Sequence, residues 1–176
     1  PEVAKAAMDA GAVIINDITG LRDAKLAGIA ARYNAGMVIM HMKGSPRTMQ
    51  KAPAYISLIN EITAYLKQAL ERAKSSGIDE DKIIVDPGLG FGKTVEHNLE
   101  ILKKLSEFKV LGRPILVGPS RKSFIGEILK TKPQERVFGT VSACVLAAKN
   151  GAKLVRVHDV LEVKQALNIF EAVEHI

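Results

Sequence analysis

The feature that most constrains the fold of this chain is a regular alternation of short apolar runs with longer helical patterns. Helical patterns cover residues 23–32, 56–75, 97–107, 121–129, 133–150 and 161–172. Five runs rich in Val and Ile predict strands buried on both faces: "AGAVIIND" (10–17), "GMVIMHM" (36–42), "KIIVDPG" (82–88), "RPILVGPS" (113–120) and "AKLVRVHD" (152–159). Such alternation predicts an α/β fold with a parallel sheet covered by helices, either open and doubly wound or closed into an eight-stranded barrel.

The length of 176 residues suits one domain, 1–176, and no linker or repeat interrupts the pattern. Five strands are three too few for a closed barrel. The chain also opens inside a helical pattern, "PEVAKAAMDAG" (1–11), with no strand before it. We therefore expect a fragment of a longer fold. Glycines introduce most of the strands as helix exits, at Gly11, Gly36, Gly77, Gly112 and Gly151.

The composition argues against several classes of function. The net charge of +6 and the pI near 9.4 invite a nucleic-acid hypothesis, but Lys and Arg are spread along the whole chain. Trp is absent and aromatic residues make up only 5%, so stacking platforms are scarce and we expect no nucleic-acid partner. No stretch approaches the roughly 20 apolar residues of a membrane span. The lone Cys144 excludes an internal disulfide, and a cytoplasmic location fits.

The stretch "VDPGLGFGKT" (85–94) resembles a phosphate-binding loop, but its spacing fits neither nucleotide motif. A P-loop needs a glycine five residues before its Gly-Lys pair, and here that position is Pro87, which has no N–H. The dinucleotide fingerprint fails because Lys93 stands where its third glycine belongs. What remains is an acid, Asp86, at the end of an apolar run, followed by a flexible loop.

Every predicted strand ends in polar residues, at the edge where α/β proteins bind ligands. In chain order these are Asn16-Asp17, His41, Asp86, Gly118-Pro119-Ser120-Arg121-Lys122, and Arg156 with His158-Asp159. Each has an ordinary explanation: an Asx turn, a satisfied core histidine, or solvated cations at a helix start. Five of them converging on one rim favour a binding site.

The residue types indicate a flat heterocycle and an anion as ligands. The Asp86 carboxylate can accept two parallel hydrogen bonds from neighbouring N–H and NH₂ groups, as in an aminopyrimidinone. Asn16 offers a donor and an acceptor, Lys122 and Arg156 suit a leaving anion, and Ser123 lies where a helix start attracts a carboxylate. No cluster has metal-ligand spacing and no nucleophile–base pair is present, so these residues favour binding and charge stabilisation over covalent catalysis.

Five stretches carry a family resemblance: "IINDITG", "VIMHMKGSPRTMQ", "IIVDPGLGFGKTVEHN", "LVGPSRKSFIG" and "LVRVHDV". In this order and spacing they resemble dihydropteroate synthase, a pterin-binding TIM-barrel family. The resemblance implies a (β/α)8 barrel. It also implies a transferase of folate biosynthesis, condensing 4-aminobenzoate with the diphosphate ester of 6-hydroxymethyl-7,8-dihydropterin to give dihydropteroate and diphosphate.

The same resemblance assigns roles to individual residues. Lys122, Arg156 and His158 are the expected catalytic residues, the last two binding the departing diphosphate. Asn16 and Asp86 are expected to hold the pterin edge, and Ser123 the aminobenzoate carboxylate. The full substrate-binding set implied is Asn16, Ile18, Met40, Asp86, Gly90, Phe91, Gly118, Lys122, Ser123, Arg156 and His158.

The chain departs from the family at its beginning. The first three βα units are absent, including the "N-x-TPDSF" loop whose asparagine binds magnesium, so Mg²⁺ is the implied cofactor with no ligand among these 176 residues. We expect the last five βα units of a barrel, with two exposed sheet edges and little activity alone. The family also implies a homodimer formed through the later helices, and sulfonamide-type inhibitors.

Three alternatives stay open at this point. A folate–corrinoid methyltransferase-type barrel also binds its pterin through Asn and Asp residues, but it does not have the "SRKSFIG" loop. A non-catalytic homologue could keep the barrel and lack the first loops. A basic nucleic-acid module would bind DNA in a salt-sensitive manner.

Overall fold

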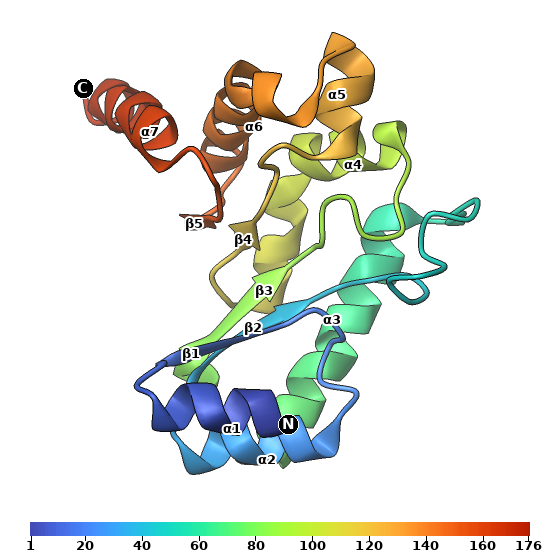
Figure 1. Cartoon of the computed structure of the whole chain (residues 1–176), viewed down its shortest axis with the longest axis vertical. Helices are drawn as coiled ribbons and strands as arrows, with labels where there is room; N and C mark the ends of the chain where they lie inside the picture. The colour runs from blue at the N-terminus through green and yellow to red at the C-terminus, as the bar shows by residue number, and fades with distance from the viewer.

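The computed structural model describes all 176 residues, and its five strands are all paired in parallel. The strands are β1 (Ile14–Asp17), β2 (Gly36–Met40), β3 (Ile83–Asp86), β4 (Leu116–Val117) and β5 (Leu154–Val155). Sheet order follows chain order, β1-β2-β3 and β4-β5, and a parallel bridge between Val85 and Ile115 links the two groups. The predicted strand–helix alternation is confirmed, and Figure 1 shows the elements advancing in sequence from α1 to α7.

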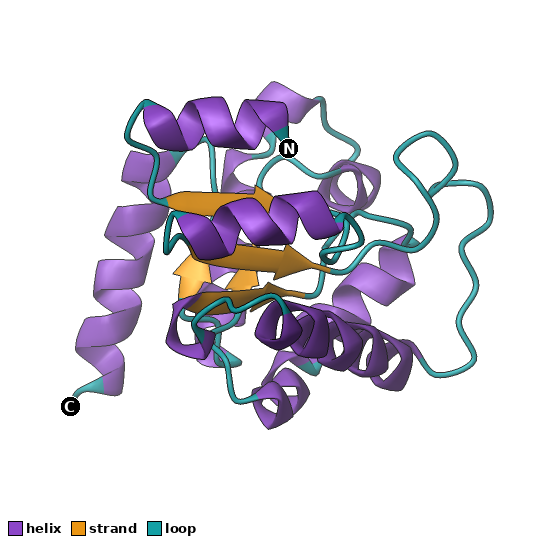
Figure 2. Ribbon diagram, turned by 90° about the horizontal axis from the view of Figure 1, so that it is seen from below, coloured by secondary structure: helices purple, strands orange, loops and turns teal.

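Seven α-helices connect and flank the strands. They are α1 (Glu2–Asp9), α2 (Ala24–Arg32), α3 (Leu58–Ser75), α4 (Val95–Lys103), α5 (Ser123–Leu129), α6 (Val137–Lys149) and α7 (Val160–Glu174). Short 3₁₀ helices occur at η1 (Glu80–Lys82), η2 (Leu105–Leu111) and η3 (Pro133–Glu135). Figure 2 shows the strands at the centre with helices around them. None of the helices combines the length and apolarity that crossing a membrane would require.

The helix predicted over 97–107 is wrong in its bounds. Thr94 caps α4 by accepting a hydrogen bond from the His97 N–H, so the helix begins two residues earlier. It ends at Lys103, and the chain continues as the 3₁₀ helix η2. Leu105 and Phe108 are both fully buried, and their spacing of three places them on one face of a 3₁₀ turn.

Gly36 does not mark a helix exit, contrary to the sequence-based expectation. The left-handed residue after α2 is Asn34, with φ of 52°, and Gly36 is instead the first residue of β2. A Cβ at Gly36 would lie 3.0 Å from Cγ1 of Ile14 in the neighbouring strand. The glycine therefore serves the close approach of β1 and β2.

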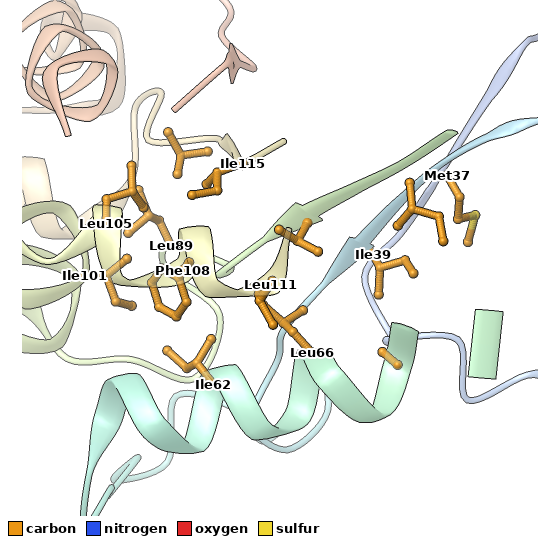
Figure 3. Packing of buried hydrophobic residues seen from close by; sticks show 14 of the residues in the cluster. Met37, Ile39, Ile62, Leu66, Leu89, Ile101, Leu105, Phe108, Leu111 and Ile115 are labelled. Carbon is orange, nitrogen blue, oxygen red and sulfur yellow. The ribbon is translucent and has the colours of Figure 1, made fainter. Parts of the chain in front are cut away.

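A cluster of 29 buried residues forms the core between the sheet and the helices. Figure 3 shows Ile62 and Leu66 of α3 directed toward Phe108 and Leu111 of η2. Burial fades at the two outer strands, where Ile14 of β1 is 51% exposed and Leu154 of β5 is 37% exposed. The three central strands are therefore the best-covered part of the sheet.

Parallel register places the carboxyl ends of the strands at one edge. Asp17 pairs with Ile39, and Met40 pairs with Asp86. The residues that follow β1, β2 and β3 therefore leave the sheet on the same side.

Candidate functional site

The polar residues at the strand ends meet across the open edge of the sheet. Nη1 of Arg156, which follows β5, donates a hydrogen bond of 2.6 Å to Oδ1 of Asn16 in β1. These residues are 140 positions apart, so only the curvature of the sheet brings them together. The contact leaves the two Nδ2 hydrogens of Asn16 for a ligand.

Asp86 is the last residue of β3 and is only 2% exposed. Its Oδ1 accepts a 2.7 Å hydrogen bond from the Gly88 N–H, which leaves Oδ2 without a partner in the chain. Burial raises the pKa of Asp86 to about 6, and the Gly88 N–H and the charges of Arg156, Lys93 and Lys122 oppose that rise. The carboxyl is therefore ionised at neutral pH, although it is almost fully buried.

Lys122 extends over an aromatic ring beside this acid. Its Nζ lies 4.2 Å from the centroid of Phe91, within the range of a cation–π contact. A Cβ at Gly90 would lie 3.1 Å from Cδ of Lys122, so the glycine leaves room for the lysine stem. Burial lowers the pKa of Lys122, while the charge of Asp86 raises it and that of Arg156 lowers it further.

Ser120 fixes the orientation of His158. The serine Oγ accepts a hydrogen bond of 3.1 Å from the His158 backbone N–H and lies 2.9 Å from its Nδ1. Either atom can be the donor in the second contact, because the serine hydroxyl can both donate and accept. The His158 ring and the Arg156 guanidinium can both donate hydrogen bonds to an anion.

The other predicted residues fall in three settings. Met40 ends β2 and is 1% exposed, and Ile18 is half-buried in the turn after β1. Gly118 is buried, and a Cβ there would lie 3.6 Å from Nη2 of Arg156. Ser123 is exposed and opens α5, as the sequence predicts. It lines a hollow together with Gln50, Lys93, Asn98 and Phe124.

Two strand-end residues have structural roles. Asp17 accepts hydrogen bonds from both the N–H and the hydroxyl of Thr19 and from the Leu21 N–H, which makes it a turn residue. His41 is 4% exposed, and its Nδ1 lies 2.9 Å from Nζ of Lys93. The ordinary reading of His41 as a satisfied core residue therefore fits the structure.

Lys93 is a buried cation that sequence reasoning missed as a partner of the site. It is 3% exposed, and Nζ also donates to the Phe91 carbonyl at 3.0 Å. Burial lowers the pKa of Lys93 to about 7, while the charge of Asp86 raises it. Burial, with Lys93 adding to it, lowers the pKa of His41 to about 2, so His41 is the acceptor of the pair. The "GFGK" motif contains this lysine, but only the fold directs it inward.

The glycine-rich loop turns its N–H groups toward the protein. The Gly88 N–H reaches Asp86, the Gly90 N–H reaches Oδ1 of Asn98 at 2.7 Å, and the Phe91 N–H reaches the Gly88 carbonyl. Side chains of residues 43–57 also hold the glycine-rich loop in place. Nε2 of Gln50, for example, donates a hydrogen bond of 2.6 Å to the Gly90 carbonyl. The loop therefore supports Phe91 and Asp86 and offers no phosphate cradle of the P-loop kind.

The residues present do not fit a magnesium site. No group of three His, Cys, Asp or Glu side chains comes together anywhere in the 176 residues. The rim itself is cationic, and the buried acid at its centre, Asp86, is surrounded by the charges of three cations. We derive no step through a metal ion.

Comparison with known proteins adds independent evidence. The family model described as "Pterin binding enzyme" matches residues 1–158. The chain belongs to this family. The dihydropteroate synthase of Escherichia coli K12 is 42% identical over 172 residues, which cover 98% of this chain and 61% of that protein. The chain thus spans less than two thirds of this relative's length.

Solved structures of the family superpose closely. A Yersinia pestis dihydropteroate synthase in complex with a sulfonamide drug gives a TM-score of 0.96 at 41% identity, covering 99% of this chain and 64% of that one. The Thermus thermophilus enzyme is 43% identical and gives TM-scores of 0.94 in complex with 6HMPPP and 0.93 in complex with 4-aminobenzoate. These matches cover 99% of this chain and 69% and 71% of those chains. The α/β fold of this chain is therefore that of the dihydropteroate synthase structures.

Proposed function

We propose that the protein containing this chain is a dihydropteroate synthase. It joins 4-aminobenzoate to (7,8-dihydropterin-6-yl)methyl diphosphate, giving dihydropteroate and diphosphate. The observation that carries the proposal is Asp86, an acid almost fully buried at the end of a central strand, whose Oδ1 accepts from the Gly88 N–H and whose Oδ2 has no partner in the chain. The complexes of the Thermus thermophilus relative with 6HMPPP and with 4-aminobenzoate support the choice of substrates.

The pterin edge suits Asp86 and Asn16. An aminopyrimidinone presents N–H and NH₂ side by side, and the carboxylate can accept both with its remaining lone pairs. The buried setting strengthens these hydrogen bonds and excludes competing water. Asn16 keeps its two donors for the acceptor atoms of the ring, because its oxygen is held by Arg156.

The diphosphate suits Arg156 and His158. Both side chains are exposed on the rim, and the imidazole of His158 and the guanidinium of Arg156 can donate hydrogen bonds to phosphate oxygens. Donors aimed at the leaving group stabilise the charge that grows as the bond to carbon breaks. Lys122, beside Asp86 and Phe91, can add a third cation.

The aminobenzoate suits Lys122 and Ser123, which lie at the start of α5. The reaction these residues support is a single displacement at the pterin methylene carbon. The carbon–oxygen bond to diphosphate breaks, a carbon–nitrogen bond to the amine forms, and the amine releases one proton to solvent. No residue of the chain is required as a nucleophile.

We also infer that the five βα units belong to an eight-stranded (β/α)8 barrel. The whole protein is then a homodimer that uses Mg²⁺ as its cofactor. Five consecutive parallel strands in chain order support the barrel, and five of eight units is close to the 61% of the Escherichia coli protein that the chain covers. The dimer and the metal rest on the family resemblance alone.

The test is diphosphate release by the protein expressed from its complete coding sequence. We expect release that requires both the pterin diphosphate and 4-aminobenzoate. Asp86→Ala should abolish it and lower pterin affinity at least about 100-fold, because two ligand donors would be buried without an acceptor. Asp81→Ala, at an exposed position, is the matched control.

Other outcomes separate the alternatives. Pterin binding with no diphosphate release would support a non-catalytic homologue. Methyl transfer from a methylated folate would support the folate–corrinoid type. Unchanged calorimetric affinity of Asp86→Ala for pterin would refute the assignment of Asp86.

A further inference from the structure

Arg136, immediately before α6, uses its guanidinium on main-chain carbonyl groups. Nε and Nη2 donate to the Thr131 carbonyl at 3.1 and 2.9 Å. Nη1 donates to the carbonyls of Arg121 and Lys122 at 2.9 and 3.3 Å. All four hydrogen bonds go to main-chain carbonyl oxygens and none goes to a carboxylate. A half-buried arginine bonded in this way holds segments of the backbone in place.

The three carbonyl groups flank α5 at its two ends. Arg121 and Lys122 precede the helix, and Thr131 follows it. The guanidinium lies against Gly126 in the middle of α5, where a Cβ would be 2.1 Å from Nη2 and 2.2 Å from Cζ. Arg136 therefore bridges both ends of the helix, and the missing side chain at Gly126 makes room for the bridge. Figure 1 shows α5 and α6 as neighbours.

The turn held by Arg136 carries Lys122. Arg121 in this turn has a φ of 58°, an unfavourable conformation for a residue other than glycine. Two further contacts hold it: its N–H donates to Oγ1 of the buried Thr140, and its guanidinium forms an ion pair with Asp159. Such a backbone conformation persists only where its surroundings impose it. The position of the next residue, Lys122, depends on these anchors.

We propose that Arg136 is a positioning residue that sets the place of Lys122, and through it the binding of the second substrate, by holding the main chain of the 119–122 turn. The identity of that substrate as 4-aminobenzoate rests on the proposed function. Asp86 and Asn16 lie on β3 and β1, outside the reach of Arg136, so pterin binding is largely independent of it. Lysine cannot replace this arginine, because a single ammonium cannot span both ends of α5.

The first test is Arg136→Lys, which keeps the positive charge but replaces the branched guanidinium, with its several N–H donors, by a single ammonium group. We expect KM for 4-aminobenzoate to rise about 10-fold or more, while Kd for the unphosphorylated hydroxymethyl pterin, which lacks the diphosphate assigned to His158, changes less than about threefold. Equal losses in both constants, or no change in either, would overturn the proposal. Amide hydrogen exchange over residues 119–126 should become faster in the same variant, a result that needs no substrate.

The second test displaces Arg136 and leaves every charge in place. Gly126→Ala puts a methyl group where the guanidinium lies, and should reproduce the rise in KM for 4-aminobenzoate. Alanine favours a helix over glycine, so a purely local effect on α5 would stabilise the protein and leave KM unchanged. Gly28→Ala in α2 is the matched control, because a Cβ there meets nothing within 4 Å.

The two tests distinguish a failure of the Arg136 proposal from a failure of the proposed function on which it rests. If the unaltered protein releases no diphosphate, the proposed function has failed, and the exchange measurement still decides whether Arg136 holds the turn. If the unaltered protein is active and the variants loosen 119–126 without raising KM for 4-aminobenzoate, Arg136 is structural only and the proposal is refuted.

Discussion

At the scale of single residues, the site is a compromise between burial and charge. Asp86 is ionised in a position that disfavours ionisation, and Lys93, buried nearby, has its pKa lowered for the same reason. A buried carboxylate with a free oxygen is a strong acceptor for paired N–H groups, and it is costly to the fold when no ligand is bound. Stability and recognition therefore oppose each other at this position.

Asp86→Asn should stabilise the unliganded protein at neutral pH. The folded pKa of Asp86 is raised from 3.8 to about 6, so its contribution to stability is fully present below pH 3.8 and is lost as pH rises through about 6. Asparagine keeps the acceptor for Gly88 and does not titrate. Denaturant unfolding should show a gain of about 1–3 kcal/mol at pH 7.5 relative to pH 4. A gain of the same size at both pH values would contradict the argument.

Arg156→Ala should weaken the diphosphate ester more than the pterin itself. The guanidinium is exposed on the rim and its link to the pterin edge is indirect, through Asn16. We expect calorimetry to give a loss of about 2–4 kcal/mol for the pterin diphosphate and of less than about 1 kcal/mol for the hydroxymethyl pterin. Equal losses for both ligands would count against Arg156 as the diphosphate residue.

At the scale of elements, the junction after β2 and β3 decides the geometry of the site. Gly88 has a φ of 73°, and a Cβ there would lie 2.0 Å from the His41 carbonyl oxygen. This approach brings the loop after β3 against the end of β2, and the bond from Gly88 to Asp86 depends on it. The fit between two neighbouring strand ends is therefore part of the binding site.

Gly88→Ala should cost much more stability than Gly112→Ala. Both glycines have left-handed φ values, 73° and 65°, but a Cβ at Gly112 would meet nothing within 4 Å. We expect about 1 kcal/mol for Gly112→Ala, from the backbone conformation alone, and at least about 3 kcal/mol for Gly88→Ala. Equal costs in denaturant unfolding would show that the close approach to His41 is unimportant.

At the scale of the whole molecule, a mildly basic chain gathers its site cations on one edge of a parallel sheet. The net charge is +6, and Lys122, Arg156 and Lys93 all act on Asp86. A field of this sign attracts an anionic substrate before contact and has little effect on a neutral one.

The association rate of the pterin diphosphate should therefore fall with salt. Raising NaCl from about 0.1 M to about 1 M shortens the Debye length from about 10 Å to about 3 Å. We expect the stopped-flow association rate to fall about tenfold for the diphosphate ester and by less than about twofold for the unphosphorylated pterin. Matching salt effects for both ligands would argue against steering by the rim.

The sequence by itself determined the strand–helix order, because period and apolar runs are local properties. It also determined that polar residues such as Asn16, Asp86 and Arg156 lie at the ends of the strands, since a strand's end can be read from the chain. The helix over 97–107 was misplaced because buried Leu105 and Phe108 suit a helical and a 3₁₀ spacing almost equally well.

Only the tertiary structure decided which of these residues act together. The bond between Arg156 and Asn16 joins residues 140 positions apart, and no local pattern encodes that distance. The burial that shifts the pKa values of Asp86 and Lys93 comes from the packing of whole elements around them. Arg136 reaches the turn before α5 only because the chain folds back after that helix. Pairing and burial depend on the path of the entire chain, whereas periodicity depends on neighbours.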